Sequence, residues 1–535
     1  MRNLSVMSIK NLMLALFFLP YTGFTQPGVK WGDQRNGTFA NPVLPADYSD
    51  IDAIRVGNDY YAISSTFQFS PGIVILHSKD MVNWTILGHV VNDLPSISPY
   101  LDWDKMDRYG RGVWAGSIRF HAGKFWVYFG TPDEGFFMST ATNPAGPWTP
   151  LHQIMNVKGW DDCCPFWDDD GKAYFIATHF SDQYKIHLFK MSPDGKNVDL
   201  NSDSVIHQSK GSEANKLYKI NSLYYHFFSE VKAEGRVTMM GRSANIYGPY
   251  ELKQLNHVNQ SVDKEPNQGG LIKAPSGKWW FFTHQGTGSW EGRAGCLLPV
   301  TWVKGWPIIG EPGADTIGNM VWNDRKPIQG LAVTAPQTTD EFNKNDLAVQ
   351  SEWNYQPRNE NWSLKKRPGF LRLYAFETAP MPESGRKLNL LYRAGNTITQ
   401  RSMRTATNEV IVQLDLNGMQ DGQVAGVCHF SSSYSSIGIK QENGKRMLVY
   451  DSNGVCTAGA QVNTSRIWLK STWDWNGINR YQYSMDGQAY HALGGTYQLR
   501  WGFYRGDRIG IFNYNNTGQG GFIDVNWFRY KYTVP

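Results

Sequence analysis

The sequence predicts an all-β protein in which a five-bladed β-propeller is followed by a β-sandwich. Five hairpins of apolar residues around a polar turn recur in the first half of the 535 residues. Their turns are about 50 to 65 residues apart, which leaves room for four short strands per repeat. From Asp340 onward, apolar and polar residues alternate as in strands with one buried face. Hardly any segment has a helical period, and a chain of this length usually forms two domains.

The N-terminus has the pattern of a secretory signal peptide. Arg2 and Lys10 precede an apolar run over residues 12–19, and small and polar residues follow this run up to Thr25. The apolar run is too short to span a bilayer, so we expect cleavage near Thr25. No cysteine near that point could accept a lipid, and no later segment is long and apolar enough to cross a membrane. We predict a signal peptide over residues 1–25 and an exported protein, periplasmic or secreted, with no membrane partner.

The propeller is predicted over residues 26–315. A second recurring element, a polar turn that ends in an aromatic residue, follows several of the hairpins and supports the count of five. This element suits the outer strands of a blade, where the turn is exposed and the ring packs against the next sheet. The hairpins cover residues 54–61, 120–126, 166–175, 217–225 and 271–280, and the second element covers residues 77–84, 139–148 and 242–250.

A connector and a sandwich are predicted for the rest of the chain. The periodicity fades into Gly, Pro and Thr before residue 340, and we predict a connector over residues 316–339 that lies over the propeller. The sandwich is predicted over residues 340–535. Its strands are indicated by the alternation in residues 409–416 and 521–530, and a hairpin turn is expected at residues 486–487.

The composition argues against nucleic acid and anionic membranes as partners. The formal net charge is only +5, and acids and bases are interspersed without a long like-charge block. No segment suggests an obligate protein partner. The 21 Trp, 27 Tyr and 27 Phe are typical of the cores of β-domains, and a few of them could instead offer faces on which sugar rings stack.

The cysteine count argues against a disulfide-built scaffold. There are five cysteines, an odd number. Cys428 and Cys456 could pair across strands of the sandwich. The neighbouring Cys163 and Cys164 are expected to be free and packed.

Three acidic residues occupy comparable positions ahead of predicted inner strands. Asp50, Asp162 and Glu213 lie seven, nine, and eight or nine residues before their hairpin turns. Because the innermost strand of each blade lines the central axis, all three should reach one mouth of the channel. Acids held together repel, so at least one should have a raised pKa and keep its proton at neutral pH. Hydrolysis of a glycosidic bond needs such a pair, since one carboxyl protonates the leaving oxygen while an ionised one activates water or attacks the sugar.

Other roles for these acids stay open. Acids at the start of a strand often form turns or ion pairs, and three carboxylates can also hold a metal ion. Ligands of hard cations usually cluster closely in sequence, as Asp168, Asp169 and Asp170 do before Gly171. An exposed hairpin turn is the simpler interpretation of that triplet.

An ordered set of short motifs resembles glycoside hydrolase family 43. The set consists of residues 41–45, 48–50, 114–119 and 162–167, and of Glu213 with residues 217–219. The C-terminal half is similar to the concanavalin-like, jelly-roll sandwich appended to many β-xylosidase and α-L-arabinofuranosidase members. The resemblance covers nearly all of the chain after the predicted signal peptide. The ordered set is highly specific, although each motif alone is not.

The resemblance implies a role for each acid. Asp50 would be the general base, Glu213 the general acid, and Asp162 the group that raises the pKa of that acid and orients it. Because the family inverts configuration, a water must fit between base and sugar, and the two carboxyls should lie roughly 6.5–9.5 Å apart. The family often has Pro where this chain has Ile51, and Gly-Pro-His where it has residues 214–216. These departures affect the shape of the pocket and the preferred sugar.

The resemblance also implies residues that bind the sugar. Arg293 would hydrogen-bond sugar hydroxyls through its several fixed donors. The alternative for Arg293 is a surface ion pair. Trp114 and Phe67 are candidate walls of the sugar subsite, with a role in the core as the alternative.

Calcium is the metal that the resemblance suggests. His284 falls where the family often places a channel histidine near a hydrated calcium ion, although a lone histidine is also commonly a packed, hydrogen-bonded residue. Asp340 and Asp524 could hold a structural calcium in the sandwich. No cofactor is expected to be required for the reaction.

These observations predict an exo-acting, inverting glycosidase that releases terminal α-L-arabinofuranosyl or β-D-xylosyl residues from plant cell-wall polysaccharides or their oligosaccharides. Arabinofuranose is favoured slightly, because a shallow propeller mouth would accept side-chain decorations as well as chain ends. A β-xylosidase acting on xylo-oligosaccharides is one alternative. A non-catalytic carbohydrate-binding propeller and a retaining transfructosylase or invertase are the others.

Overall fold

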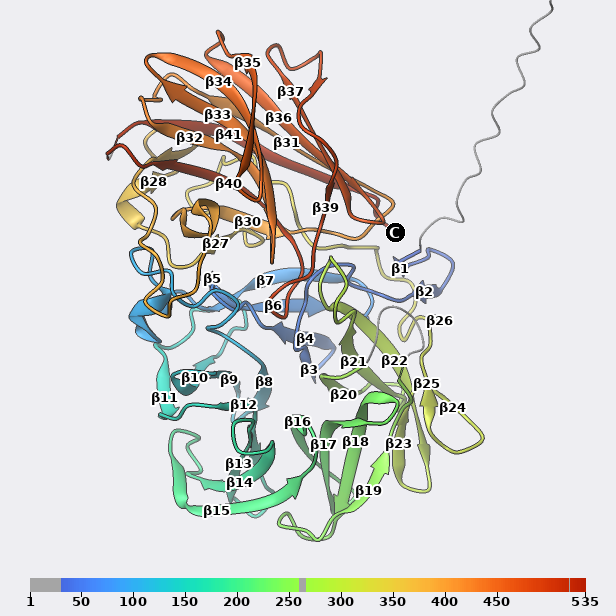
Figure 1. Ribbon diagram of the computed structural model, residues 1–535. Coiled ribbons are helices and arrows are strands. Elements are labelled where there is room, and N and C mark those ends of the chain that lie inside the picture. Colours follow the sequence, from blue (N-terminus) through green and yellow to red (C-terminus); the bar gives the residue numbers. More distant parts are fainter. Residues whose placement is uncertain (1–29, 259–265, 519) are drawn as a thin grey trace, which may run out of the picture.

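The computed structural model describes residues 30–258, 266–518 and 520–535, and the predicted signal peptide lies outside these ranges. Figure 1 shows two stacked parts, a group of short sheets formed by the first half of the chain and a larger β-sandwich formed by the second half. The described helices are single 3-10 turns, η1 (Leu94–Ser96), η2 (Pro99–Leu101), η3 (Asn359–Asn361) and η4 (Leu390–Arg393). None of these helices has the length and apolar character needed to cross a membrane. The all-β prediction is confirmed.

Five antiparallel four-stranded sheets follow one another along the described part of the first half. Each predicted hairpin forms the first two strands of one sheet. In chain order the sheets are β3 (Asp52–Val56), β4 (Asp59–Ser64), β6 (Gly72–Ser78) and β7 (Trp84–Val91); β8 (Gly116–His121), β9 (Lys124–Thr131), β10 (Gly135–Ala141) and β11 (His152–Met155); β12 (Trp160–Trp167), β13 (Ala173–His179), β14 (Lys185–Met191) and β15 (Val198–Gln208); β16 (Glu213–Ile220), β17 (Leu223–Lys232), β18 (Gly235–Ser243) and β19 (Glu251–Gln254); and β20 (Gly269–Lys273), β21 (Trp279–Gln285), β22 (Ala294–Val303) and β23 (Trp306–Ile309).

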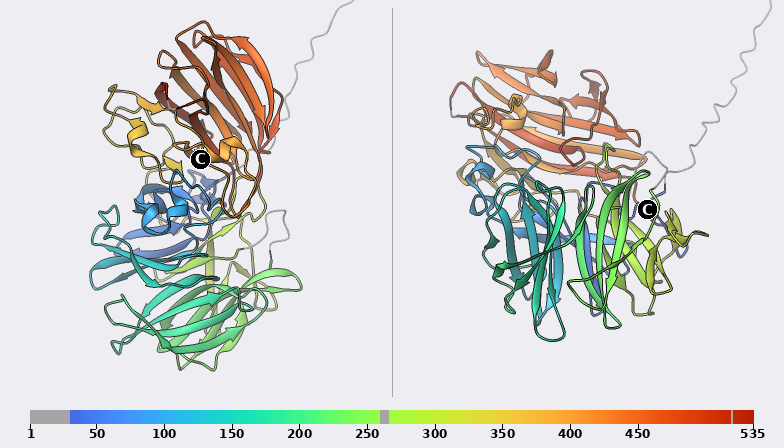
Figure 2. Two further views of the ribbon diagram at one scale, coloured as in Figure 1. Left: turned by 60° about the vertical axis from the view of Figure 1, so that its left-hand side comes forward. Right: turned by 60° about the horizontal axis from the view of Figure 1, so that its bottom comes forward.

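The first strand of each sheet lines a central channel. One cavity of about 490 Å³ is bordered by residues of β3, β8, β12, β16 and β20. Strand β3 lies beside both β8 and β20, so the last sheet returns to the first. Figure 2 shows from two further sides how these sheets lie together beneath the sandwich. Residues at the start of the five inner strands therefore surround one end of the channel.

Aromatic rings join each sheet to the next. Each neighbouring pair of sheets shares a contact between two rings. Such a contact stabilises the fold by roughly 0.5–1.5 kcal/mol in addition to the burial of apolar area. The contacts, with distances between ring centroids, are Tyr61 with Phe125 (4.9 Å), Tyr128 with Phe175 (6.2 Å), Phe166 with Tyr224 (6.2 Å), Phe227 with Phe281 (5.1 Å) and Trp84 with Phe282 (4.5 Å). The last contact joins the fifth sheet to the first, so side-chain packing closes the ring.

The segment predicted as a connector takes part in the fold. β26 (Asn323–Arg325) extends the sheet of β1 (Gly32–Asp33) and β2 (Thr38–Ala40), and β25 (Gly318–Asn319) pairs with β24 (Glu311–Pro312). Just after β26, the buried Lys326 ammonium lies between the carboxylates of Asp33 and Asp80. This ion pairing fastens the predicted connector to the N-terminal strands.

The second half forms two large packed sheets. One of the two sheets has β5 (Phe69–Ser70) as an edge strand, paired with β27. Strand β5 comes from the propeller half, and the sequence pattern did not assign it to the sandwich. The strand order in this sheet is β35 (Val455–Gln461), β34 (Lys445–Ser452), β33 (Tyr434–Glu442), β32 (Gln423–Phe430), β40 (Arg508–Asn515), β30 (Ile398–Arg401), β27 (Glu352–Asn354) and β5. The other sheet contains β28 (Trp362–Ser363), β29 (Leu371–Tyr374), β41 (Phe522–Tyr532), β31 (Thr407–Asp415), β36 (Arg466–Asp474), β37 (Ile478–Ser484), β38 (His491–Ala492) and β39 (Tyr497–Gln498).

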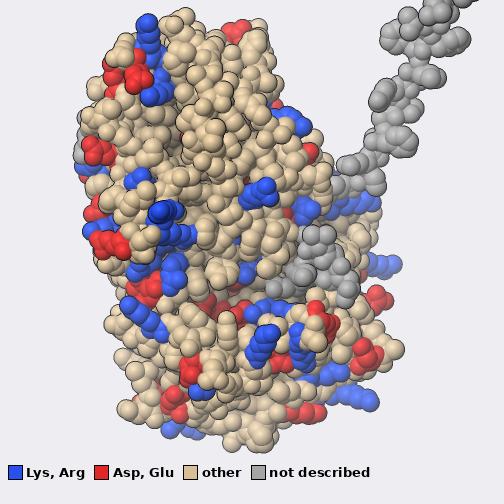
Figure 3. Space-filling view, viewed as in Figure 1, with Lys and Arg blue, Asp and Glu red and all other residues tan. Residues whose placement is uncertain are grey.

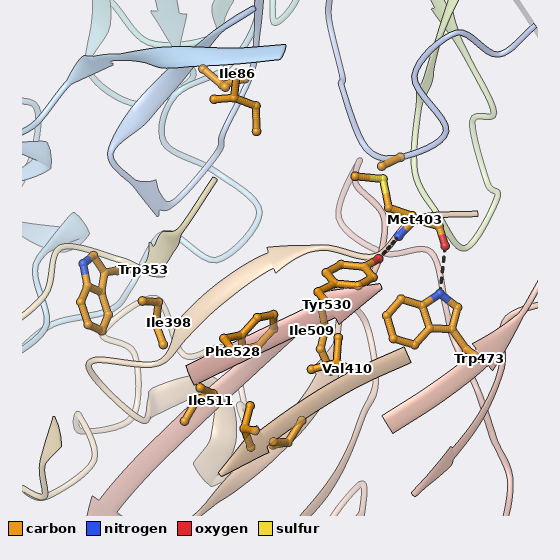
Figure 4. Close-up of a cluster of buried hydrophobic side chains, with 14 of the residues drawn as sticks. Ile86, Trp353, Ile398, Met403, Val410, Trp473, Ile509, Ile511, Phe528 and Tyr530 are labelled. Atoms are coloured by element: carbon orange, nitrogen blue, oxygen red, sulfur yellow. Dashed lines mark hydrogen bonds between the residues drawn. The ribbon is translucent and has the colours of Figure 1, made fainter. Parts of the chain in front are cut away.

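The core of the sandwich lies between these two sheets. Figure 4 shows Val410 and Phe528 of one sheet facing Ile511 of the other, and all three are buried. Two polar side chains of this cluster are hydrogen-bonded to the backbone of Met403. The Tyr530 hydroxyl accepts the Met403 N–H at 2.7 Å, and the Trp473 indole N–H donates to the Met403 carbonyl at 2.9 Å. The predicted strands over residues 409–416 and 521–530 are therefore confirmed as β31 and β41.

All five cysteines are free. The pairing considered for Cys428 and Cys456 is wrong, because Cys428 is buried in β32 and Cys456 is exposed in β35, with β33 and β34 between them in the sheet. Cys163 and Cys164 are free and buried, as predicted.

A buried ion cluster joins the two domains. Glu352 accepts hydrogen bonds from Arg401 at 2.8 Å and Arg508 at 2.6 Å, and it contacts His89 of β7 at 3.1 Å. Burial alone would raise the pKa of Glu352, but the two arginines outweigh it and hold that pKa well below its usual value. Arg401 also donates through Nε to the carbonyl of Asp47 at 2.6 Å. The cluster thus ties the segment just before Asp50 to the sandwich.

Charges of both signs are spread over the surface. Figure 3 shows Lys and Arg interspersed with Asp and Glu on the face viewed in Figure 1. This face offers no continuous basic track of the kind that follows a nucleic-acid backbone.

Candidate active site

The three predicted acids meet in one cavity. Asp50 lies just before β3, Asp162 lies in β12, and Glu213 is the first residue of β16. All three line a cavity of about 410 Å³ at the end of the channel that faces the sandwich loops. Equivalent positions on inner strands of three sheets therefore converge, as their spacing from the hairpin turns predicted.

An unusual backbone conformation accompanies each acid. Asp50 (φ 56°), Asp162 (φ 54°) and Ala214 (φ 69°), the residue after Glu213, adopt left-handed conformations. The strand register shifts between Asp161 and Cys164 and again just after Glu213. A non-glycine residue in this region costs roughly 1–3 kcal/mol and persists only where its surroundings hold it. Such strain is typical of functional sites, and here it breaks the alternation of the strands beside the acids.

The carboxylate of Asp50 is fixed from both sides. Ser65 donates to its Oδ2 at 2.7 Å, and Arg293 donates through Nη1 to its Oδ1 at 2.7 Å. The Asp50 backbone N–H donates to Nδ1 of the buried His284 at 2.8 Å. His284 therefore holds the left-handed backbone of Asp50, and the predicted sugar-binding residue Arg293 holds its side chain.

Asp162 supports the backbone beside Glu213. Its Oδ2 accepts the Ala214 N–H at 2.8 Å, its Oδ1 accepts the Gln268 amide, and its main-chain carbonyl accepts the Asn215 amide at 2.9 Å. Burial raises the pKa of Asp162, and the negative charge of Asp50 adds to the rise, although Lys216 opposes it. The cavity thus contains a carboxyl whose pKa is raised chiefly by burial and to a smaller extent by a neighbouring acid.

Glu213 has two contacts that the sequence did not indicate. Arg236 of β18 contacts its Oε1 at 3.1 Å, and the Asn267 amide donates to the same oxygen at 3.4 Å. Arg236 is itself held by the Gly211 carbonyl at 2.7 Å and by Ser229 at 3.0 Å. No motif marks Arg236 or Asn267 in the sequence, because each reaches Glu213 from a separate strand or loop.

The predicted walls of the site are where they were expected. Trp114 and Phe67 line the cavity, and Phe67 is buried and pairs with Val113. The cavity also has walls that were not predicted, formed by Thr178, Phe180, Tyr184 and Thr287.

The sandwich contributes directly to the cavity. Trp501 and Tyr504, from the loop between β39 and β40, line it. The guanidinium carbon of Arg293 lies 5.7 Å from the Trp501 ring centroid, and the Tyr504 ring lies 5.8 Å from that of Trp114. The catalytic and sugar-binding residues proposed from the sequence all lie in the propeller, so these two walls from the sandwich were not predicted. A cluster of three aromatics at residues 501–504 was the available signal, but nothing in the sequence shows where this loop docks.

A second acid next to Asp162 was also missed. Asp161 lines the same cavity and is only partly buried. A regular strand would point neighbouring side chains to opposite faces, so the pattern favoured one acid at this position. The register shift at Asp162 brings both to the cavity.

The residues considered for calcium have protein partners. Asp524 accepts hydrogen bonds from Arg367 and Arg372, and Asp340 accepts backbone N–H groups of Phe342 and Ala348. Within the described ranges no group of three or more His, Cys, Asp or Glu side chains could hold a metal ion. Calcium at Asp340 and Asp524 and calcium near His284 both stay predictions.

The acidic triplet before Gly171 is a hairpin turn. The Gly171 N–H donates to the Asp168 carbonyl at 3.1 Å, and the side chain of Asp169 is 86% exposed. Asp168 and Asp169 both contact the ammonium of Lys219. These contacts confirm the simpler interpretation of the triplet.

Known proteins resemble both parts of this chain. A family model described as "Glycosyl hydrolases family 43" matches residues 39–307, and one described as "Beta xylosidase C-terminal Concanavalin A-like domain" matches residues 339–531. A β-xylosidase of Formosa agariphila is 36% identical over 552 residues, which cover 94% of this chain and 92% of that protein. The non-reducing end α-L-arabinofuranosidase BoGH43B of Bacteroides ovatus is 31% identical over 365 residues, covering 63% of this chain and 65% of that protein.

A solved structure extends the likeness to the whole fold. The GH43 protein BlXynB of Bacillus licheniformis matches with a TM-score of 0.78 at 26% identity, over 93% of this chain and 100% of that one. The likeness therefore covers both domains of this chain. The family model and the long alignment with the Formosa protein, together with the three converging acids, show that this chain belongs to the glycosyl hydrolases of family 43.

Proposed function

We propose that this protein is an exo-acting, inverting glycosidase that removes terminal β-D-xylosyl residues from plant cell-wall polysaccharides or their oligosaccharides. The observation that carries the proposal is that Asp50, Asp162 and Glu213 line one cavity. Its volume of about 410 Å³ is in the usual range for small-molecule sites and suits a short stretch of sugar. The signal peptide predicted over residues 1–25 supports export to the periplasm or the medium, where such polysaccharides would be met.

Glu213 is the general acid in this proposal, and Asp50 is the general base. Glu213 protonates the oxygen of the leaving group, while Asp50 takes a proton from a water that attacks the anomeric carbon from the opposite face. Asp50 suits this role because Ser65 and Arg293 fix the direction of its carboxylate. For inversion, the carboxyls of Asp50 and Glu213 should lie roughly 6.5–9.5 Å apart, so that the water fits.

Asp162 acts as the positioning residue for the acid. Its hydrogen bond to the Ala214 N–H holds the backbone from which Glu213 projects. This support fixes the direction in which Glu213 can donate its proton.

Xylose is favoured over arabinofuranose for two reasons. The relative that is 36% identical over 94% of the chain is a β-xylosidase. The preference for arabinofuranose assumed a shallow mouth formed by the propeller alone, whereas Trp501 and Tyr504 of the sandwich add walls to the cavity. α-L-Arabinofuranosidase activity is the second candidate, supported by the relative from Bacteroides ovatus.

Leaving-group dependence tests the acid and base roles. Rates are measured on nitrophenyl β-xyloside, nitrophenyl α-L-arabinofuranoside and xylobiose, and the faster nitrophenyl substrate identifies the sugar. Glu213→Gln should lose far more kcat on xylobiose than on the nitrophenyl glycoside, because a good leaving group needs little protonation. Asp50→Asn should lose at least about 10³-fold on both, because each needs the activated water. Exposed Asp169→Asn is the matched control. Unchanged hydrolysis by Glu213→Gln would refute its role.

The stereochemistry of the product tests inversion. Proton NMR of the first turnovers on a β-xyloside should show α-xylose, followed by slower mutarotation. Initial β-xylose would contradict the inverting assignment and favour the retaining alternative. Binding of xylose without hydrolysis of any pentoside would favour a non-catalytic propeller.

A further inference from the structure

Asp161 is a fourth acid in the cavity, and the reaction described above does not use it. Asp161 pairs with Thr178 across β12 and β13, immediately before the register shift that ends at Cys164. In a regular strand, Asp161 and Asp162 would face opposite sides of the sheet. The left-handed backbone of Asp162 (φ 54°) breaks this alternation, and both side chains line the same cavity.

Packing holds the Asp161 carboxyl in place. Its Oδ1 atom is buried and has no hydrogen-bond partner among the described residues. This atom lies against Gly130 of β9, where an added Cβ would come within 2.6 Å of it. The Gly130 carbonyl accepts the Trp114 N–H at 3.0 Å, so Asp161 sits beside the Trp114 wall of the cavity. A buried polar atom without a partner costs about 1–3 kcal/mol and calls for an explanation.

The electrostatic surroundings suit a neutral carboxyl. Burial raises the pKa of Asp161 well above its usual value, and the nearby charges of Asp162, Asp50 and Glu213 add to the rise. Asp161 therefore keeps its proton at a pH where an exposed aspartate has lost it. A protonated carboxyl donates one hydrogen bond and accepts others. This capacity matches a sugar hydroxyl, which also donates and accepts.

We propose that Asp161 is a specificity-determining residue whose carboxyl hydrogen-bonds one hydroxyl of the terminal sugar. The inference rests on the proposed function and deepens it, because it names a residue that would distinguish pentoses by the position of a hydroxyl. A site built to bond a hydroxyl rejects a sugar that lacks it, because the protein group is then left buried without a partner. Two observations place this selectivity at Asp161: its partly exposed side chain lines the cavity, and packing of Oδ1 against Gly130 fixes the direction of the carboxyl.

Deletion of single hydroxyls from the substrate tests the proposal. The values of kcat/KM are measured for the wild type, Asp161→Ala and Asp161→Asn on the faster nitrophenyl pentoside and on its monodeoxy analogues. One analogue should cost the wild type about 10- to 100-fold, whereas the same deletion should cost Asp161→Ala less than about threefold. The intrinsic reactivity of each analogue affects the wild type and the variant equally, so it cancels when their losses in kcat/KM are compared. Asp161→Asn keeps the side-chain shape and should retain part of the penalty.

The controls separate binding from other roles. Asp169→Asn, in the exposed turn of the same hairpin, should lose as much kcat/KM as the wild type on every deoxy analogue. Thermal melting reports whether each variant folds. If Asp161→Ala does not fold, the comparison of deoxy analogues is made with Asp161→Asn. A purely electrostatic role would shift the pH profile of kcat/KM equally on all substrates.

The outcomes distinguish this inference from the proposed function. Suppose that the wild type hydrolyses the parent pentoside, but that the Asp161 variants lose as much kcat/KM as the wild type on every deoxy analogue. The inference is then overturned, and the proposed function stands. A uniform loss on every analogue also overturns it. If the wild type cleaves neither nitrophenyl pentoside, the proposed function fails and the inference fails with it.

Discussion

Replacing Trp501 with Ala should weaken catalysis although Trp501 lies in the sandwich. Its ring is 5.7 Å from the guanidinium carbon of Arg293, which in turn holds Asp50 at 2.7 Å. Loss of this cation–π contact costs about 0.5–1 kcal/mol. Loss of roughly 50 Å² of apolar contact with the sugar costs about 1 kcal/mol more. Together these losses amount to about 2 kcal/mol, or about a 30-fold lower kcat/KM.

The assay is steady-state hydrolysis of the faster nitrophenyl pentoside, with thermal melting to confirm that the sandwich is intact. Trp501→Phe should recover part of the loss, since it keeps an aromatic face. Trp527→Ala is the matched control, because Trp527 also carries an arginine over its ring, Arg529 at 4.3 Å, but does not line the cavity. A kcat/KM that stays within about twofold of wild type in Trp501→Ala, or an equal loss in Trp527→Ala, would refute the claim that the sandwich completes the active site.

Two further predictions concern stability and reactivity. Glu352→Gln should destabilise the protein by about 3–5 kcal/mol at pH 7, because Arg401 and Arg508 would lose their buried counter-charge. The pKa of Glu352 is lowered in the folded state. Its contribution to the free energy of unfolding is therefore present above the unfolded pKa of about 4.3 and declines as the pH falls below that value. Denaturation curves in which Glu352→Gln loses the same stability at pH 7 and at pH 3.5 would contradict this. A thiol reagent should modify Cys456 alone in the native protein and all five cysteines in denaturant, and fast labelling of Cys163 or Cys428 would mean that the buried sites open.

The propeller hairpins and the positions of the three acids could be predicted because both are local in sequence. A strand, a turn and the next strand lie within about ten residues of one another, and the acid lies a nearly constant distance before the turn. Asp161 was not predicted, because regular alternation places neighbouring residues on opposite faces of a strand, and only the left-handed backbone of Asp162 interrupts this alternation. The pairing considered for Cys428 and Cys456 does not form, for a related reason. Strand order places two strands between them, and that order is not encoded in the spacing of the cysteines.

The sequence by itself determined the all-β class, the repeat of hairpins and which acids begin inner strands. These properties follow from backbone preferences and side-chain alternation over a few residues, which act before distant segments meet. Only the tertiary structure decided that Arg236 and Asn267 reach Glu213, that β5 joins the sandwich, and that Trp501 and Tyr504 wall the cavity. Such contacts depend on how whole sheets dock, and docking is set by packing and buried charge summed over both domains, which no local pattern contains.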